Sequence, residues 1–154
     1  MKIKIISGGQ TGVDRAALDA AIATRLPYGG VIPKGRIAED GTISPSYKNL
    51  EEAPVSDYVY RTEQNVIKSD ATLILGYWPM NGGTHMTNEL CHKHHKVHTF
   101  IDLEKADLEN QKSILSWINE IKPTILNVAG PRESKQPGIY QKVRLLLENV
   151  FKKL

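Results

Sequence analysis

The residues best suited to hold a ligand form one short segment near the start of the chain, Ser7-Gly8-Gly9-Gln10-Thr11-Gly12-Val13-Asp14-Arg15. Its three glycines have no Cβ to keep a ligand away from the backbone, and they accept positive φ angles. The segment joins a predicted strand, Ile3 to Ile6, to a predicted helix, and the first turn of a helix leaves positively polarised N–H groups unpaired. Together these features predict the binding of an anion, most simply a phosphate.

The spacing of these glycines excludes two familiar nucleotide-binding motifs. The segment lacks the Gly-x-x-x-x-Gly-Lys-Ser/Thr of a P-loop and the Gly-x-Gly-x-x-Gly of a dinucleotide-binding fold. A dinucleotide fold also needs an acidic residue after its second strand, where this chain has Pro33-Lys34-Gly35-Arg36. The cations at that point suggest a second anionic group. Asp14 has two open interpretations, a ligand contact or a capping box with Thr11, and both can hold at once.

Further positive charge is concentrated in and beside the loops that follow the predicted strands. Arginine can grip phosphate oxygens at two points, and a shared cleft focuses the field of several cations on an incoming anion. The alternative for any one of them is a solvated surface charge. The candidate cations are Arg15, Lys34, Arg36, Arg61, Arg132 and Lys135.

Strand and helix patterns alternate along the chain that must position these residues. The alanine-rich stretch from about Val13 to Arg25 predicts a helix that lies close to a sheet. The alternation predicts one Rossmann-like α/β domain over residues 1–154, with three layers and a mostly parallel sheet covered by helices on both faces. The predicted strands are 3–6, 30–32, 71–75, 97–101 and 124–128, and the later helices are 62–68, from the turn at 81–84 to about 95, 108–121 and 136–151.

The loops that follow the strands of a parallel sheet emerge at one edge, and ligands bind at that edge. These loops carry residues 8–12, 33–41, 77–84 and 130–134, so we expect all four to share one cleft. The polar stretch from Lys34 to about Asp57 is long and contains two glycines and two prolines. Its length predicts either a functional loop or disorder.

Composition limits the class of protein. The 154-residue chain has 40% hydrophobic residues and a net charge of +3, which suits a globular protein with a small anionic ligand better than a nucleic-acid binder. No apolar run approaches a membrane span, so no membrane partner is expected. The lone cysteine, Cys91, excludes an intramolecular disulfide and agrees with the cytoplasm. The histidine-rich stretch from Cys91 to His98 matches no closed zinc pattern, so no metal site is predicted.

The sequence resembles the molybdenum carrier family over nearly its whole length. This family belongs to the wider Rossmann-like group that includes the lysine-decarboxylase-like phosphoribohydrolases. The motifs that carry the resemblance are residues 7–19, Pro33-Lys34-Gly35-Arg36 with Ala38-Glu39-Asp40-Gly41, Arg61-Thr62-Glu63 with Asn65-Val66, residues 69–74, Gly82-Gly83-Thr84, and residues 127–134.

The resemblance implies a homo-oligomer, a dimer or tetramer, that carries the molybdenum cofactor without covalent attachment and can pass it to a molybdoenzyme. This cofactor, molybdopterin, is a pterin with a dithiolene-held molybdate and a terminal phosphate, so both ends are anionic. The first glycine turn would cradle the phosphate, the cations would supply charge, and the second glycine turn would form the facing wall. The expected ligand-binding residues are Gly8, Gly9, Gln10, Thr11, Gly12, Asp14, Arg15, Lys34, Gly35, Arg36, Gly82, Gly83, Thr84 and Arg132.

The same resemblance offers an enzymatic alternative. The phosphoribohydrolase relatives use the motif Pro-Gly-Gly-x-Gly-Thr-x-x-Glu, and the comparable stretch here is Asn81 to Glu89, with His85 in place of a glycine. That replacement alters how closely a sugar phosphate can sit. The alternative reaction is hydrolysis of the N-glycosidic bond of a nucleoside monophosphate, with Glu89 assisting and Arg15 or Arg61 holding the phosphate. A third possibility is a nucleotide-sensing module without turnover.

Overall fold

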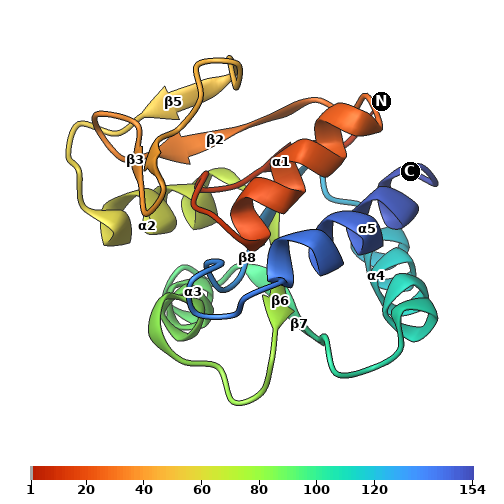
Figure 1. Ribbon diagram of the computed structural model, residues 1–154. Helices are drawn as coiled ribbons and strands as arrows, with labels where there is room; N and C mark the ends of the chain where they lie inside the picture. The colour runs from red at the N-terminus through yellow and green to blue at the C-terminus, as the bar shows by residue number, and fades with distance from the viewer. Residues whose placement is uncertain (1) are drawn as a thin grey trace.

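The computed structural model of the chain describes residues 2–154, in which six strands form one sheet in the order β5-β2-β1-β8-β6-β7 (Figure 1). Every neighbouring pair in this sheet is parallel. The predicted Rossmann-like α/β fold with a mostly parallel sheet is therefore confirmed. The strands are β1 (Lys4–Ile6), β2 (Tyr28–Ile32), β3 (Ile37–Ala38), β4 (Gly41–Thr42), β5 (Leu50–Glu52), β6 (Ala71–Gly76), β7 (Val97–Asp102) and β8 (Ile125–Ala129), and the helices are α1 (Val13–Ala23), α2 (Tyr58–Lys68), α3 (Gly82–Lys93), α4 (Asp107–Ile121) and α5 (Ile139–Phe151).

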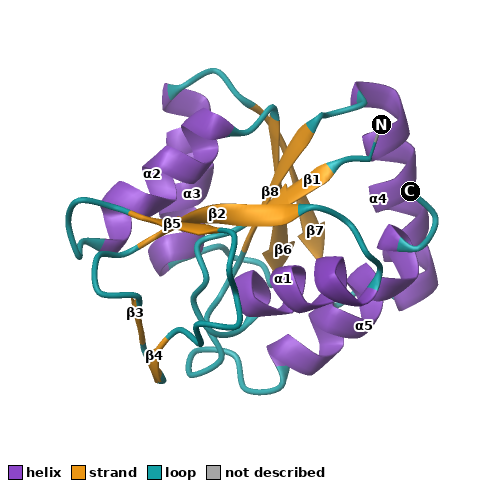
Figure 2. Ribbon diagram, turned by 90° about the horizontal axis from the view of Figure 1, so that it is seen from above, coloured by secondary structure: helices purple, strands orange, loops and turns teal. Residues whose placement is uncertain are grey.

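Helices cover both faces of the sheet, α1, α4 and α5 on one side and α2 and α3 on the other (Figure 2). The main hydrophobic core lies under the first group and includes the fully buried Leu126 and Leu147. A small cluster of Val66, Leu90 and Cys91 joins α2 to α3. None of the helices in residues 2–154 combines the length and the apolar character needed to cross a bilayer.

Helix α1, which follows the glycine-rich turn, packs closely on the sheet because its inner face is made of small side chains. Ala16, Ala17, Ala20 and Ala21 are completely buried, so the helix axis lies close to the sheet and to α5. The helix ends at Ala23, and the C-cap residue Thr24 donates its N–H to the carbonyl of Ala20. This termination is two residues earlier than the sequence pattern predicts, within the usual uncertainty of helix ends.

The stretch from Lys34 to Asp57 is ordered, and the prediction of a loop without structure was wrong. It forms a small antiparallel hairpin, β3 and β4, and then the edge strand β5, which pairs with β2. The Arg36 guanidinium holds the segment together by donating to three backbone carbonyls, those of Ile43, Ser44 and Tyr47. Helix α2 then begins at Tyr58, four residues before the predicted start, because the Asp57 carboxylate accepts from the N–H of Val59 and caps it.

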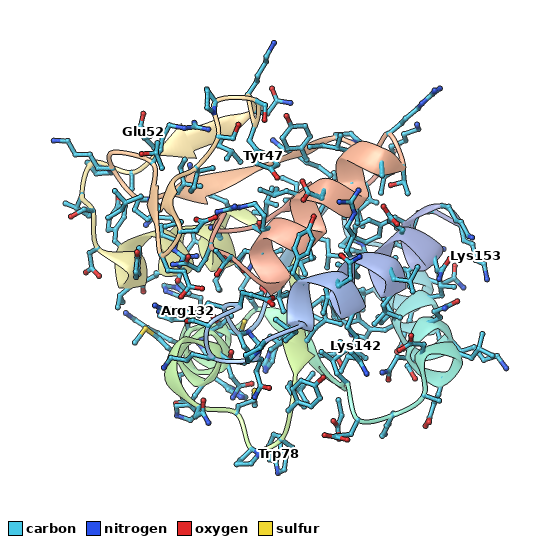
Figure 3. All side chains as sticks on the ribbon, viewed as in Figure 1. Tyr47, Glu52, Trp78, Arg132, Lys142 and Lys153 are labelled. Atoms are coloured by element: carbon cyan, nitrogen blue, oxygen red, sulfur yellow. The ribbon has the colours of Figure 1, made fainter. Side chains whose placement is uncertain are left out.

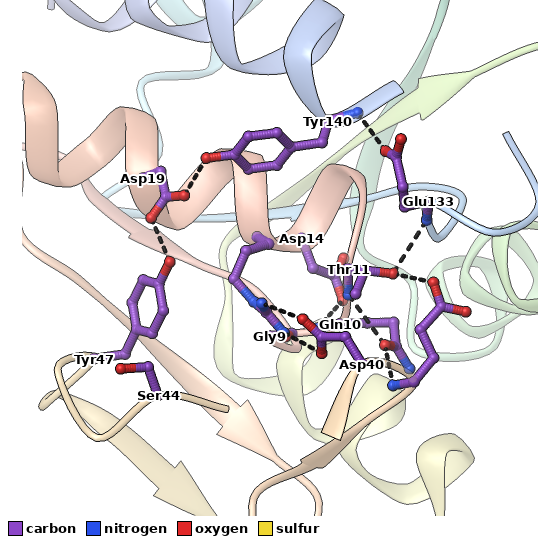
Figure 4. Close-up of polar contacts among 12 residues, drawn as sticks. Gly9, Gln10, Thr11, Asp14, Asp19, Asp40, Ser44, Tyr47, Glu133 and Tyr140 are labelled. Atoms are coloured by element: carbon purple, nitrogen blue, oxygen red, sulfur yellow. Dashed lines mark hydrogen bonds and ion pairs between the residues drawn. The ribbon is translucent and has the colours of Figure 1, made fainter. Parts of the chain in front are cut away.

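Polar contacts fasten the hairpin to the glycine-rich turn (Figure 4). The Glu39 carboxylate accepts from the Thr11 hydroxyl and from the Ser134 N–H and hydroxyl. Asp40 forms a two-point ion pair with Arg15, with N–O distances of 3.1 and 3.3 Å. These contacts tie the hairpin to both loops at the carboxyl end of the sheet.

Two tyrosines complete this attachment by sharing one carboxylate. Tyr47, from the segment after β4, and Tyr140, from α5, each donate a hydrogen bond to Asp19 on α1 (Figure 4). Burial and the Asp19 carboxylate raise the pKa of the Tyr47 phenol, so it remains a donor at physiological pH. The hairpin segment is therefore held at its base as well as at its tip.

Candidate anion-binding cleft

A small cleft opens between α2, α3 and the loops that follow β1 and β8, with a cavity volume of about 70 Å³. One water molecule occupies about 30 Å³ of the liquid, and pockets for whole drug-sized ligands measure roughly 300–1,000 Å³. The cleft is therefore of a size to enclose a phosphate group rather than a complete cofactor. Its lining is Gly8, Gln10, Asp14, Arg61, Thr62, Asn65, Asn81, Gly83, Thr84, Thr87, residues 127–131, Arg132 and Lys135.

A buried ion pair lies at the base of the cleft. Arg61 Nη1 donates to Asp14 Oδ2 at 2.9 Å, and the two side chains are only 10% and 7% exposed. Burial raises the pKa of the Asp14 carboxyl, while the neighbouring guanidinium favours its charged form. A Cβ on Gly8 would lie 1.7 Å from Arg61 Nη1, so only glycine leaves room for the guanidinium.

Asp14 also accepts from the backbone N–H of Gln10, at 3.3 Å, and it does not form the capping box considered above. The N-cap of α1 is Gly12, with no side-chain cap. Thr11 is engaged elsewhere, because its hydroxyl oxygen accepts from the N–H of Glu133 at 3.1 Å. The carboxylate of Asp14 is thus turned toward Arg61 and the cleft.

Two buried donor atoms on residues that line the cleft have no acceptor in residues 2–154. The Gln10 Oε1 atom accepts from the N–H groups of Thr11 and Glu39, at 3.0 and 2.9 Å, which fixes the orientation of the amide and leaves its NH2 group on the other side (Figure 4). Gln10 Nε2 and Arg61 Nε are both buried without a hydrogen-bond partner in residues 2–154. The residues themselves are 5% and 8% exposed. Buried donors of this kind cost about 1–3 kcal/mol each until an acceptor reaches them.

Positive groups converge above these donors. The guanidinium carbons of Arg61 and Arg132 lie 5.4 and 5.7 Å from the centroid of the same ring, that of Tyr58 at the start of α2. Figure 3 labels Arg132 between the ribbons of α2 and α3. Lys135 also lines the cleft, and within residues 2–154 neither Arg132 nor Lys135 forms an ion pair. Like charges gathered in this way favour an anion between them.

The amino-terminal end of α3 forms the opposite wall. Its N-cap, Asn81, makes no side-chain cap hydrogen bond, and the first turn holds no acidic residue. Gly83, Thr84 and Thr87 line the cleft from this helix. Unpaired N–H groups at a helix start attract an anion, so this wall adds to the field of the cations.

Helix α2 is fixed to the sheet by one side chain. Asn65, which is 2% exposed, accepts from the N–H of Val31 at 2.8 Å and donates to the carbonyl of the same residue at 2.9 Å. Arg61 lies one helical turn earlier on the same face. The position of its guanidinium therefore depends on this attachment to β2.

Six of the fourteen residues predicted to bind the ligand come together in this cleft. Those that line it are Gly8, Gln10, Asp14, Gly83, Thr84 and Arg132, joined by Arg61 from the enzymatic alternative. Those that lie outside the lining are Gly9, Thr11, Gly12, Arg15, Lys34, Gly35, Arg36 and Gly82. The expectation that four loops share one cleft was therefore wrong for residues 33–41, because the hairpin folds against the other side of the glycine-rich turn.

Several residues outside the cleft have structural partners that explain their positions. Gly12, at φ 77°, faces the carbonyl of Pro131, which also accepts from the N–H of Val13, so the start of α1 is closed. Gly9, at φ 73°, packs against two isoleucine side chains. Arg15 is occupied by Asp40, and the Lys34 N–H donates to a backbone carbonyl after β5. The uncapped helix start that lines the cleft is that of α3.

Two lining residues of α2, Thr62 and Asn65, were not among the predicted ligand contacts. Tyr58, Arg61, Thr62 and Asn65 are spaced as one face of a helix, and this spacing would have identified the wall had the helix been extended back to Asp57. Thr87 was missed for a different reason. The motif comparison was aligned on Glu89, two residues further along the chain.

The structure corrects that alignment. Glu89 lies outside the cleft lining, with a side chain 62% exposed and 3.9 Å from His85. The cleft positions on α3 are Gly83, Thr84 and Thr87. They match the Gly-Thr-x-x-Glu part of the phosphoribohydrolase motif, with Pro79 at its proline and Thr87 at the position of the glutamate.

Two comparisons with known proteins agree with this arrangement. The family model cpYpsA, described as the circularly permutated YpsA SLOG family, matches residues 5–151. The chain is similar to a crystal structure named "Putative molybdenum carrier protein" from Syntrophus aciditrophicus SB, with 46% sequence identity and a TM-score of 0.92 over 97% of this chain and 94% of that chain. No curated protein matches the sequence. The resemblance to the molybdenum carrier family is confirmed, and the chain belongs to the circularly permutated YpsA SLOG family.

Proposed function

We propose that the cleft binds the phosphate end of an anionic ligand and that the protein carries this ligand without converting it. The observation that carries the proposal is the pair of buried donors, Gln10 Nε2 and Arg61 Nε, that have no acceptor in residues 2–154. A phosphate oxygen supplies the missing acceptor, and the charges of Arg61, Arg132 and Lys135 compensate its negative charge. The cleft is preorganised for such a group.

The cargo that best fits the family and this chemistry is the molybdenum cofactor. The similar crystal structure is named as a molybdenum carrier, and the cofactor ends in a phosphate. A volume of about 70 Å³ takes that phosphate, so the pterin and the molybdenum lie beyond the enclosed part. We further propose that the protein works in the cytoplasm and delivers the cofactor to a molybdoenzyme.

The lining of the cleft supports carriage rather than hydrolysis. Asp14 is the one carboxylate among the lining residues, and it is bound by the Arg61 guanidinium and the Gln10 N–H. A general base must instead be able to accept a proton from water or substrate. Thr87 stands where the phosphoribohydrolase motif has its glutamate, and Glu89 faces solvent. Within residues 2–154, the cleft lining therefore offers the hydrolase alternative no free carboxylate as a general base.

Cofactor uptake by the purified protein tests this proposal. The protein is incubated with molybdenum cofactor released from a molybdoenzyme, desalted and denatured, and the oxidised pterin is measured by fluorescence. We expect uptake with micromolar or tighter affinity. Arg132→Gln should weaken uptake about tenfold, because it removes a charge-assisted hydrogen bond from a cation that forms no ion pair within residues 2–154. Lys34→Gln is the matched control, since Lys34 is exposed and outside the cleft, and it should leave uptake unchanged.

Incubation with AMP separates the alternatives. Release of free adenine at a rate proportional to protein concentration would overturn carriage without turnover. Tight binding of AMP without uptake of the cofactor would favour the nucleotide-sensing module. Equal loss of uptake in Arg132→Gln and Lys34→Gln would show that the ligand lies elsewhere.

A further inference from the structure

Strand β7 forms an unprotected edge of the sheet. It is the last strand in the order β5-β2-β1-β8-β6-β7, and within residues 2–154 it pairs with β6 alone. All six of its residues are in register with β6, so no bulge interrupts it. His98, Thr99 and Phe100 are partly exposed, whereas every residue of β6 is buried. An edge of this length presents a row of unpaired N–H and C=O groups to any strand that meets it.

The opposite edge of the sheet shows how this chain protects a strand that stays exposed. Strand β5 has three residues, and two of them, Glu51 and Glu52, are charged and exposed. Short length and charge are devices that prevent pairing with other chains. Strand β7, Val97-His98-Thr99-Phe100-Ile101-Asp102, has neither lysine nor proline and is twice as long. The difference between the edges indicates that β7 is covered in the assembled protein.

Exposed apolar side chains lie beside β7. Trp78, which is 67% exposed, packs its ring edge-to-face on Phe100 with the centroids 5.6 Å apart. Figure 3 shows Trp78 at the lower extremity of the molecule, on the loop that leaves β6. Val97, at the start of β7, is 49% exposed. Large apolar side chains gathered at an open edge are typical of a contact surface.

The charges around β7 are arranged so that the strand complements itself. Its amino-terminal end is preceded by Lys96, and its carboxyl-terminal end carries Asp102 and Glu104. Asp107, the first residue of α4, adds a third acid, and the three outnumber Lys105. Two copies that pair antiparallel bring the basic end of each strand beside the acidic end of the other.

We propose that β7 pairs with β7 of a second copy, antiparallel about a two-fold axis at Thr99, so that two sheets become one. A two-fold contact uses the same surface on both copies and leaves no open β7 edge. With Thr99 opposite itself, Lys96 stands opposite Asp102 of the second copy, and Val97 stands opposite Ile101. The Lys96 ammonium donates to the Ser69 carbonyl at 2.8 Å and has two further N–H groups for this contact.

The mass in solution is the first test. Sedimentation equilibrium of the full chain should give twice the 17.2 kDa of one copy. Val97→Lys puts one ammonium group from each copy into the paired edge, opposite the apolar Ile101 of the other copy. We expect it to raise the dimer dissociation constant about tenfold or more. Leu145→Lys is the matched control, because Leu145 on α5 is 57% exposed and remote from β7 in sequence and layer. A monomeric native protein, or a dimer that Val97→Lys leaves intact, would overturn the proposal.

A cysteine at the axis tests the pairing itself. Residues directly opposite in antiparallel strands have Cα atoms about 4.5–5.5 Å apart, within the range of about 4.4–6.8 Å that a disulfide spans. Thr99→Cys should therefore give a covalent dimer on mild oxidation. Val97→Cys should not, because its two copies lie about 13 Å apart in this register. The native Cys91 is completely buried and serves as the background. No link through Thr99→Cys, or an equal link through Val97→Cys, would contradict the Thr99-centred pairing.

Discussion

Replacing Gln10 with glutamate changes the cleft by one atom. The Gln10 Oε1 atom accepts two backbone N–H groups, those of Thr11 and Glu39, and a glutamate oxygen keeps both hydrogen bonds. The other end of the side chain, the buried NH2 group without an acceptor, becomes a carboxylate oxygen. Gln10→Glu therefore preserves the shape of the side chain and its attachment to the hairpin. It replaces the NH2 donor, which we propose binds the ligand, with an oxygen that can only accept.

The size of the effect follows from this geometry. The variant loses a hydrogen bond to a charged group, which is worth about 1.5–3 kcal/mol. It also puts a negative charge about 5 Å from the anion, which at an effective dielectric constant of about 20 costs about 3 kcal/mol. The electrostatic cost alone raises the dissociation constant of a phosphate ligand more than about 100-fold. We expect no measurable binding at concentrations that saturate the native cleft.

Titration calorimetry with inorganic phosphate and with a phosphate monoester measures this effect. A thermal melt of each variant with and without phosphate provides a second readout, because a ligand that binds only the folded state raises its melting temperature. Gln141→Glu makes the same chemical change on α5, at an exposed position in the hollow on the hairpin side of the turn, and controls for net charge. Phosphate affinity in Gln10→Glu within threefold of the native value would refute the role given to the unpaired amide.

Two further predictions concern stability. Hydrogen bonds from His94 and Lys93 lower the pKa of Glu63 below its usual 4.5, so this contact between α2 and α3 stabilises the fold above pH 4.5 and is lost as the pH falls through the lower pKa of the folded state. Glu63→Gln should therefore flatten the acid side of a plot of unfolding free energy, measured in urea, against pH. An unchanged slope would contradict the contact. Gly12→Ala should cost more than about 2 kcal/mol in urea unfolding, because the residue has φ 77° and its Cβ would lie 2.3 Å from the Pro131 carbonyl. Gly83→Ala, with no atom within 4 Å of its Cβ, should be neutral or stabilising by up to about 1 kcal/mol, and equal losses in the two variants would be inconsistent with these surroundings.

The order of strands and helices could be predicted because local sequence determines it. The apolar run Ala71 to Leu75 and the alanine-rich face of α1 each carry their own pattern, and both elements occur where they were expected. Strand β5 has no such pattern, since Leu50 is followed by two glutamates. It becomes a strand because β2 offers it a parallel edge, and that contact is formed between segments distant in the sequence.

The candidate site was predictable in its chemistry and only in part in its geometry. Arg61 and Arg132 were recognised as cations near loop ends, and the structure brings both to the ring of Tyr58. Lys34 and Arg36 met the same criterion, but sequence does not tell on which side of the glycine-rich turn a loop will fold. The part played by Gln10 depends on the backbone of Glu39, a partner supplied by the hairpin that the sequence analysis did not foresee.

The two walls of the cleft differ in how firmly they are fixed. Asn65 meets Val31 as a neighbouring strand would, with one hydrogen bond in each direction, so α2 cannot slide along the sheet without losing both at once. The position of the Arg61 guanidinium is therefore fixed relative to β2. Helix α3 is joined to α2 near its carboxyl-terminal end, by the small apolar cluster around Cys91 and by the contacts of Lys93 and His94 with Glu63. The α2 wall is thus held by hydrogen bonds one turn from Arg61, whereas the α3 wall is held at the far end of its helix. We expect adjustment to ligands of different size to fall to the first turn of α3.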